Sequence, residues 1–257
     1  MSKITEVADQ LWNADLEKYA IAPIREVIGA TDIDSAYKIQ QLNVEKRIRQ
    51  GEQVVGKKIG LTSFAVQEQL GVDQPDYGML FNTNEVKDGG TLSYAELLQP
   101  KAEAEIAFVM GEDLDGDINM SDLIGAIDYA LASIEIVGSR VENWDIRITD
   151  TIADNASASH FVLGSKKVNI EELDLENCRM TMTKNKETAS EGVGKACMDN
   201  PLNAALWLAQ VMIKNGTPLK KGEILLSGAL GPMVPIEQGD EFTAEIEGLG
   251  SVSVKID

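Results

Sequence analysis

The chain is organised around residues 97–109, which read Leu97-Leu98-Gln99-Pro100-Lys101-Ala102-Glu103-Ala104-Glu105-Ile106-Ala107-Phe108-Val109. This stretch predicts a β-strand from Ala102 to Val109. Because successive side chains of a strand point to opposite faces, Glu103 and Glu105 share one face, with Cα atoms about 7 Å apart. Paired carboxylates repel each other and resist burial, and a hard cation such as Mg²⁺ or Mn²⁺ relieves both problems. The alternative is a solvated edge strand.

A third acidic residue strengthens the metal interpretation. Glu135 lies in the apolar run Ala132-Ser133-Ile134-Glu135-Ile136-Val137. A charge in such a run is costly unless it is paired or binds a metal, although an outward-facing position on a half-exposed strand would also accommodate it. With Glu103 and Glu105 it would form a three-carboxylate site that leaves positions open for water and substrate. The sequence therefore predicts that Glu103, Glu105 and Glu135 bind Mg²⁺ or Mn²⁺.

The composition limits the classes of partner. The 257 residues are 44% hydrophobic, enough for one large domain or two small ones with a buried core. Against 42 acidic residues stand only 23 lysines and arginines, which gives a net charge of −19. This balance argues against nucleic acid and anionic membranes as partners, since both require basic patches. No apolar run approaches the length of a membrane span.

The few cysteines and the single histidine limit the kinds of catalytic or metal site that the chain can contain. Cys178 and Cys197 form no CxxC motif and no disulfide framework. The start of the sequence has no signal-peptide apolar region, so we expect a reducing, cytoplasmic location. His160 is the only histidine, which nearly excludes histidine-based zinc sites and Ser-His-Asp triads.

Apolar periodicity and turn residues predict an α+β fold without repeats or long linkers. Helices are expected over residues 4–19, 34–50, 121–131 and 200–216. Strands are expected over residues 54–60, 102–109, 132–137, 178–182, 223–227, 242–246 and 252–256. We therefore predict one structural unit, in which a helical N-terminal part (residues 1–60) precedes a β-rich catalytic body (residues 61–257).

Several other residues could contribute to a site, although each also has a plain structural interpretation. Lys58, on a strand next to glycine, could bind a substrate carboxylate or move a proton, and Lys57 must point to the opposite face. Asp76 lies in a Pro-Asp-Tyr-Gly loop that a turn-forming aspartate would also suit. Leu70 could line the site or belong to the core. Ser157 ends a small, polar stretch that could wrap a ligand.

Three further features carry less weight. The acidic loop Asp113-Leu114-Asp115-Gly116-Asp117 lacks the EF-hand spacing, because the position that needs glutamate is Ile124. The stretch Gly228-Ala229-Leu230-Gly231-Pro232 lacks the Lys-Ser/Thr of a P-loop. His160 follows the Ser157 stretch, so it could line the site or simply pack nearby.

Taken together, these motifs resemble the 2-keto-4-pentenoate hydratases, a branch of the fumarylacetoacetate hydrolase superfamily. The resemblance runs in order from about Ile21 to Ile256. It rests on the stretches Gly56-Lys57-Lys58-Ile59-Gly60-Leu61-Thr62-Ser63, Gln69-Leu70-Gly71-Val72-Asp73-Gln74-Pro75-Asp76-Tyr77-Gly78, Gln99-Pro100-Lys101-Ala102-Glu103-Ala104-Glu105, Glu135-Ile136-Val137-Gly138-Ser139-Arg140, Asp154-Asn155-Ala156-Ser157 and Ser227-Gly228-Ala229-Leu230-Gly231-Pro232-Met233.

The resemblance implies a fold, a reaction and a set of site residues. The implied body is a mixed β-roll or barrel-like structure of the fumarylacetoacetate hydrolase type. The implied reaction is hydration of 2-hydroxypenta-2,4-dienoate to 4-hydroxy-2-oxopentanoate in aromatic meta-cleavage catabolism. The family's metal ligands map onto Glu103, Glu105 and Glu135. Its active-site lysine and aspartate map onto Lys58 and Asp76, and its serine maps onto Ser157. From its place just before the Asp76 loop, Leu70 is expected as a second substrate-binding residue.

The resemblance leaves alternatives open. The chain has Ala158-Ser159-His160 where a cysteine and a glycine are expected after the serine, which affects the expected substrate preference more than the chemistry. Close alternatives are a 4-oxalocrotonate decarboxylase, a hydratase for longer dicarboxylates, and a non-catalytic partner subunit of a hydratase–decarboxylase complex. The implied assembly is a large homo-oligomer, a pentamer or decamer, with a downstream aldolase or the sister decarboxylase as possible partners.

Overall fold

The computed structural model describes residues 2–64, 67–68 and 72–257, so the predicted site residue Leu70 lies outside the described residues. The first part of the chain is helical: α1 (Lys3–Glu17), α2 (Arg25–Ile28) and α3 (Ile33–Arg49) precede the first strand. The Ser2 hydroxyl caps α1 by accepting a hydrogen bond from the Thr5 N–H, as the sequence predicts. Helices α5 (Met120–Ala126), α6 (Ile148–Ala153) and α7 (Pro201–Lys214) follow later in the chain.

The strands of the described residues form two mixed, open sheets, and this confirms the predicted α+β class. The large sheet has the order β2-β1-β10-β5-β6-β7-β3, with β11 paired to β5, and the smaller has the order β4-β13-β12-β8-β9. The strands of the large sheet are β1 (Val54–Gly60), β2 (Asp76–Phe81), β3 (Glu85–Lys87), β5 (Lys101–Met110), β6 (Ile127–Val137), β7 (Ala158–Leu163), β10 (Ile224–Ala229) and β11 (Val234–Pro235). Those of the smaller sheet are β4 (Gly90–Leu92), β8 (Arg179–Lys184), β9 (Glu187–Val193), β12 (Glu241–Ile246) and β13 (Gly250–Ile256).

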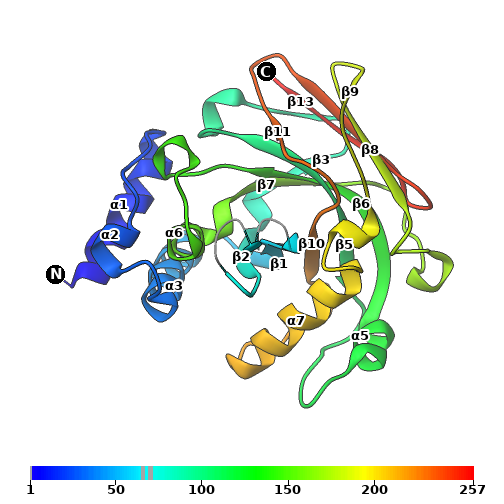
Figure 1. The fold of residues 1–257 in the computed structure, drawn as a ribbon, viewed down its shortest axis with the longest axis horizontal. Coiled ribbons are helices and arrows are strands. Elements are labelled where there is room, and N and C mark those ends of the chain that lie inside the picture. Colours follow the sequence, from blue (N-terminus) through cyan, green and yellow to red (C-terminus); the bar gives the residue numbers. More distant parts are fainter. Residues whose placement is uncertain (1, 65–66, 69–71) are drawn as a thin grey trace.

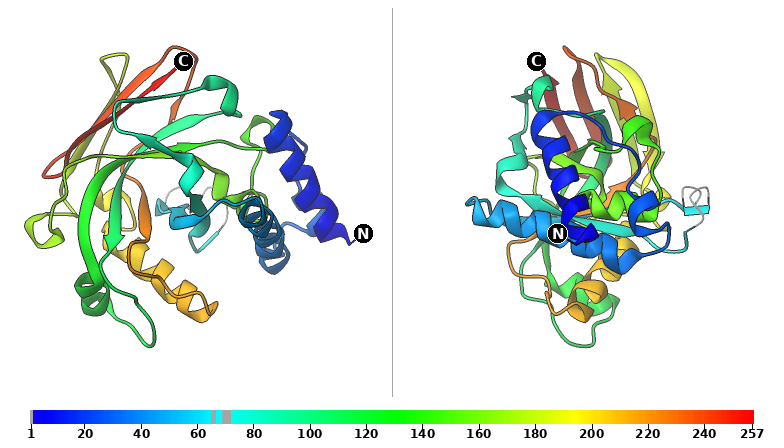
Figure 2. Two further views of the ribbon diagram at one scale, coloured as in Figure 1. Left: turned by 180° about the vertical axis from the view of Figure 1, so that it is seen from behind. Right: turned by 90° about the vertical axis from the view of Figure 1, so that its left-hand side faces the viewer.

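The elements are arranged so that the helical part borders one end of the large sheet. Helices α1, α2, α3 and α6 gather on one side of the molecule, whereas β8, β9 and β13 lie on the opposite side (Figure 1). The same separation is visible from behind (Figure 2, left). The strand β1 lies within the large sheet, between β2 and β10. The predicted division of the chain at residue 60 stays a prediction.

The main core fills the space between the two sheets. One face of β5 and β6 carries apolar side chains, among them Ala104, Ile106 and Ile134, and they belong to the same buried cluster as Met182 of β8 and Phe242 of β12. This is the face that the alternation of residues 102–109 assigns to the core. The glutamates of β5 and β6 are therefore on the other face of the large sheet.

One predicted helix is wrong in its extent. The sequence predicts a helix from Ser121 to Leu131, whereas α5 ends at Ala126 and β6 begins at Ile127. The helix is capped by Asn119, whose side chain accepts from the N–H groups of Ser121 and Asp122. The apolar positions Ile127 and Leu131 fit a helical spacing, but pairing with β5 over the whole length of β6 decides the structure.

Candidate active site

The register between β5 and β6 brings the three predicted acidic residues together. Glu103 on β5 is directly opposite Glu135 on β6, and Glu105 is opposite Ser133. Side chains that are opposite one another in antiparallel strands lie on the same face, where like charges are destabilising. Carboxylate oxygens of Glu103, Glu105 and Glu135 all lie within 4.8 Å of one another. The geometry thus places the three side chains as a single cluster.

Burial makes this cluster costly without a partner. The side chains of Glu105 and Glu135 are 0% exposed. Glu105 Oε2 accepts a hydrogen bond of 2.9 Å from the Gly228 N–H. Among the described residues, Glu105 Oε1 and Glu135 Oε2 have no hydrogen-bond partner, and Glu135 Oε1 has only an ion pair with Lys58. Burial and the neighbouring carboxylates raise the pKa of Glu105 well above its ordinary value, and burial raises that of Glu135 to about 7. Oxygen-only donors with unused lone pairs are what a hard divalent cation requires.

Glycines allow the neighbouring strands to approach this cluster. Gly228 on β10 has a φ of +109°, a conformation that side chains rarely adopt, and a Cβ there would lie 2.1 Å from Thr62 Oγ1. A Cβ on Gly60 would lie 2.3 Å from Asp76 Oδ1. The glycine-rich stretch around Gly228, which the sequence only excludes as a P-loop, thus supplies a backbone donor to Glu105.

Lys58 supplies the positive charge of the site. Its Nζ forms an ion pair of 3.1 Å with Glu135 Oε1 and donates a hydrogen bond of 3.0 Å to the Ala156 carbonyl. Burial alone would lower the pKa of Lys58, but the carboxylates of Glu135, Glu103 and Glu105 raise it above its ordinary value on balance. Lys57 points to the other face and pairs with Glu223 at 2.5 Å, as the alternation along β1 predicts.

Asp76 lies beside Lys58 because Gly60 of β1 pairs with Asp76 at the start of β2. Its Oδ2 accepts a hydrogen bond of 3.0 Å from the Thr151 hydroxyl of α6, and its buried Oδ1 has no hydrogen-bond partner among the described residues. Burial raises the pKa of Asp76. This side chain therefore has one fixed oxygen and one that is free to interact with a ligand.

These groups border a cavity of about 580 Å³, a volume suited to a small molecule. The residues that line it include Lys58, Asp76, Glu103 and Ser157. The Ser157 hydroxyl is buried and has no hydrogen-bond partner within residues 2–64, 67–68 and 72–257. Apolar walls come from Leu61, Ile146 and Met233, among others. His160 does not line this cavity but a smaller one behind the Ser157 segment.

Three lining residues escape the sequence analysis as site residues. Thr151 fixes Asp76, and Lys101 lies at the cavity with its Nζ 4.2 Å from the centre of the Trp144 ring. The alternation along β5 puts Lys101 on the face of Glu103 and Glu105, so that signal is present in the sequence. Thr151 begins the small, polar stretch that ends at Ser157, and the sequence indicates that stretch as a whole without assigning a role to Thr151. Trp144 comes from a segment that reaches the sheet only through tertiary packing, and its local sequence carries no such signal.

Comparison with known proteins gives the family. The model of the fumarylacetoacetate (FAA) hydrolase C-terminal domain matches residues 51–257. The chain belongs to the fumarylacetoacetate hydrolase family. This confirms the resemblance that the motifs indicate.

Relatives within this family are similar over nearly the whole chain. A protein of Pseudomonas putida called TodF product hydratase is 52% identical over 97% of this chain and 94% of its own length. The 2-keto-4-pentenoate hydratase of Paraburkholderia phymatum is 52% identical over 98% of this chain and 96% of its own length. Among solved structures, 4-oxalocrotonate decarboxylase of Pseudomonas putida G7, complexed with magnesium and adipate, has a TM-score of 0.94 and 34% identity, and covers 99% of this chain and 97% of that one.

No helix among the described residues is both long and apolar enough to cross a membrane.

Proposed function

We propose that this chain is a hydro-lyase that adds water to 2-hydroxypenta-2,4-dienoate to give 4-hydroxy-2-oxopentanoate, in the breakdown of aromatic compounds by meta-cleavage. One observation carries the proposal: a cluster of the half-buried Glu103 with the buried Glu105 and Glu135, paired with Lys58, borders a small-molecule cavity in a chain about half identical to hydratases. A purely structural chain has no use for three converging acids of which two are buried.

We propose that Glu103, Glu105 and Glu135 bind Mg²⁺ or Mn²⁺. The support is the set of buried glutamate oxygens without a hydrogen bond from the described residues, and the presence of magnesium in the decarboxylase structure. When bound, such an ion supplies positive charge against the carboxylate and the C2 oxygen of the substrate, where negative charge develops during the reaction. The Gly228 N–H keeps Glu105 oriented toward the cluster.

We assign proton handling to Lys58 and Asp76. Lys58 Nζ keeps its proton because three carboxylates surround it, and the Ala156 carbonyl fixes its direction. It can donate a proton to a carbon of the dienol or hold the substrate carboxylate. Asp76 Oδ1 has no hydrogen-bond partner in the part of the chain that the structure describes, so it can accept a hydrogen bond from the water that adds at C4 and take its proton. The Ser157 hydroxyl lies in the same cavity and can bind the substrate.

A decarboxylase is the second candidate, and Lys101 is the observation that favours it. A dicarboxylate substrate requires a cation for its second carboxylate, and Lys101 is a second lysine at the cavity besides Lys58. The apolar walls and the greater identity to hydratases favour the monocarboxylate dienol.

The two candidates are separated by substrate and product. Purified protein with Mg²⁺ or Mn²⁺ is mixed with freshly generated 2-hydroxypenta-2,4-dienoate, and the decay of its ultraviolet absorbance is followed while the product is identified by mass spectrometry. The proposal predicts decay with formation of 4-hydroxy-2-oxopentanoate. Release of CO₂ from 2-oxohex-3-enedioate with no turnover of the dienol would make the chain a decarboxylase. Inactivity toward both would favour the non-catalytic partner subunit.

We expect the active protein to be an assembly of several chains. We propose that the protein forms a large homo-oligomer, and that the sister decarboxylase or a downstream aldolase associates with it, since each would handle the unstable dienol or its product. Light scattering of the purified protein gives the subunit number directly.

A further inference from the structure

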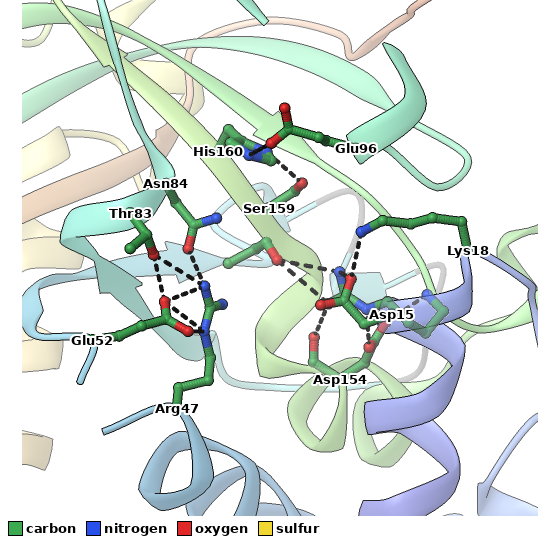
Figure 3. A network of polar contacts seen from close by, with 12 residues as sticks. Asp15, Lys18, Arg47, Glu52, Thr83, Asn84, Glu96, Asp154, Ser159 and His160 are labelled. Atoms are coloured by element: carbon green, nitrogen blue, oxygen red, sulfur yellow. Dashed lines mark hydrogen bonds and ion pairs between the residues drawn. The ribbon is translucent and has the colours of Figure 1, made fainter. Parts of the chain in front are cut away.

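A second, smaller cavity of about 100 Å³ lies behind the substrate cavity, and residues 154–158 separate the two. Asn155 lines the small cavity, whereas Ala156 and Ser157 line the substrate cavity. The polar network of the small cavity includes Asp15 of α1 and Lys18, which directly follows α1, together with Asp154 (Figure 3). Contacts that hold residues 154–158 on the side of the small cavity therefore also set the positions of Ala156 and Ser157 in the substrate cavity.

The backbone of this segment needs such support. Asn155, Ala156 and Ser157 have φ values of 54°, 51° and 57°, so three consecutive non-glycine residues are in the left-handed region. Residues persist in this region only when surrounding contacts hold them there. The Asn155 side chain provides one such contact, since its amide bonds to the N–H and carbonyl of Met79 on β2.

Arg140 holds both ends of the segment. At the first end, its backbone N–H donates to Asp154 Oδ2 at 2.9 Å, its Nε bonds to Asp154 Oδ1, and its Nη2 donates to the Asp154 carbonyl at 2.6 Å. At the other end, Nη1 donates to the Ala158 carbonyl at 3.3 Å. The side chain is buried, and Asp15 of α1 lies 4.0 Å from Nη1.

We propose that Arg140 is a positioning residue for the reaction in the substrate cavity, an inference that rests on the proposed function. By holding Asp154 and Ala158 together, Arg140 sets the left-handed turn between them. The turn aims the Ala156 carbonyl at Lys58 Nζ and places the Ser157 hydroxyl in the cavity. The planar guanidinium, with its fork of donors, reaches both ends at once, which a lysine ammonium cannot do.

The matched control is Arg47, which lines the same small cavity. It pairs with Glu52 at 2.6 Å and bonds to Asn84 at 2.7 Å, and the structure gives it no hydrogen bond to residues 154–158. Replacing either arginine by alanine removes a positive charge and an ion pair from this cavity. Only the replacement of Arg140 removes hydrogen bonds to residues 154–158.

The test compares R140A, R140K and R47A with the wild type. We expect R140A to lower kcat about 100-fold, the order that misplacement of catalytic groups costs, and R140K to recover little of it. Guanidinium ion at about 20 mM should restore part of the R140A activity by occupying the vacated space, and should leave R47A unchanged. Wild-type kcat in R140A, or equal losses in R140A and R47A, would overturn the proposal.

Hydrogen exchange gives a readout independent of activity. In R140A and R140K, the peptide that contains residues 154–158 should exchange at least about tenfold faster than in the wild type, while a peptide from β5 keeps its protection. R47A should leave the 154–158 peptide unchanged. Unchanged exchange of that peptide in both Arg140 variants would overturn the inference. If the wild type fails to hydrate the dienol, the proposed function fails, and the exchange data still decide whether Arg140 holds the segment.

Discussion

Glu105 is one of the three proposed metal ligands, and its replacement tests the site at a single residue. Its side chain is fully buried beside two other acids, and its Oε1 has no hydrogen-bond partner among the residues that the structure describes. In Glu105→Gln, the amide oxygen can still accept from the Gly228 N–H, but one negative charge is lost. We expect kcat with Mg²⁺ to fall at least about 1000-fold, because the cluster loses a charged ligand.

The same variant should be more stable than the wild type when both are free of metal. Removing one of three repelling carboxylates, two of them buried, should raise the free energy of unfolding by about 1–2 kcal/mol at pH 8. Thermal unfolding in EDTA measures this, with Glu112→Gln at an exposed position as the control. A Glu105→Gln protein that keeps full activity, or is less stable than the wild type in EDTA, would contradict the metal assignment.

His160 offers a pH test, since it is the only histidine of the chain. Burial lowers its pKa from 6.5 to about 4, with further lowering from the Lys18 charge. The folded protein therefore resists protonation while the unfolded chain accepts it. His160 stabilises the fold above pH 6.5, and this contribution is lost as the pH falls toward 4, by about 3 kcal/mol in total.

The single imidazole makes the measurement direct. In untagged protein, the ring proton signal of His160 in the NMR spectrum should titrate near pH 4 rather than near 6.5. His160→Gln should lose less stability than the wild type between pH 6.5 and 4, in denaturant titrations at several pH values. An NMR titration midpoint close to pH 6.5 would show that the His160 ring is solvated. It would then make no pH-dependent contribution to the stability of the fold.

At the scale of elements, β1 presents two adjacent lysines to opposite faces. Lys58 points to the acidic cluster and Lys57 to Glu223. We expect Lys58→Met to lower kcat about 1000-fold, because the site loses its proton donor and cation. Lys57→Met should instead lower the free energy of unfolding by about 2 kcal/mol, because Glu223 loses its partner, and should leave kcat within about threefold of wild type. Equal effects of both changes on kcat would refute the separation of roles.

Sequence patterns predict an element best where the burial of one of its faces determines its secondary structure. The alternation along residues 102–109 gives the face of Glu103 and Glu105 correctly, and the Ser2 cap marks the start of α1. The boundary between α5 and β6 could not be found this way, because Ile127 and Leu131 fit either period. Only the long pairing with β5 decides it.

The tertiary contacts of the helical part could not be predicted from local sequence either. Gln40 of α3 donates to the Tyr77 carbonyl at 2.8 Å and to the Ile152 carbonyl at 3.0 Å, so it joins α3 to β2 and α6 at the back of the site. A glutamine within a helical pattern carries no signal of such contacts. The parallel pairing of β1 with β10 likewise joins segments about 170 residues apart in the sequence, as the register Lys57↔Leu225 illustrates.

At the scale of the whole molecule, the net charge of −19 opposes the compact state by self-repulsion. Salt screens this repulsion, since the Debye length falls from about 10 Å at 0.1 M to about 3 Å at 1 M. We expect the Tm to rise by about 3 °C between 0.05 and 0.5 M NaCl, measured by calorimetry without divalent ions. A falling Tm would mean that the ion pairs of the described residues, such as Lys57–Glu223, outweigh the general repulsion.

The central claim is that the glutamate cluster binds the ion on which hydration depends. The most direct measurement is turnover of 2-hydroxypenta-2,4-dienoate by protein stripped with EDTA, then titrated with Mn²⁺ while bound ion is counted by electron paramagnetic resonance. The account predicts no turnover without metal, and full turnover when one ion is bound per chain. It also predicts loss of both the bound ion and the activity in Glu105→Gln. Unchanged turnover in EDTA, or stoichiometric Mn²⁺ binding that survives in Glu105→Gln, would contradict the account.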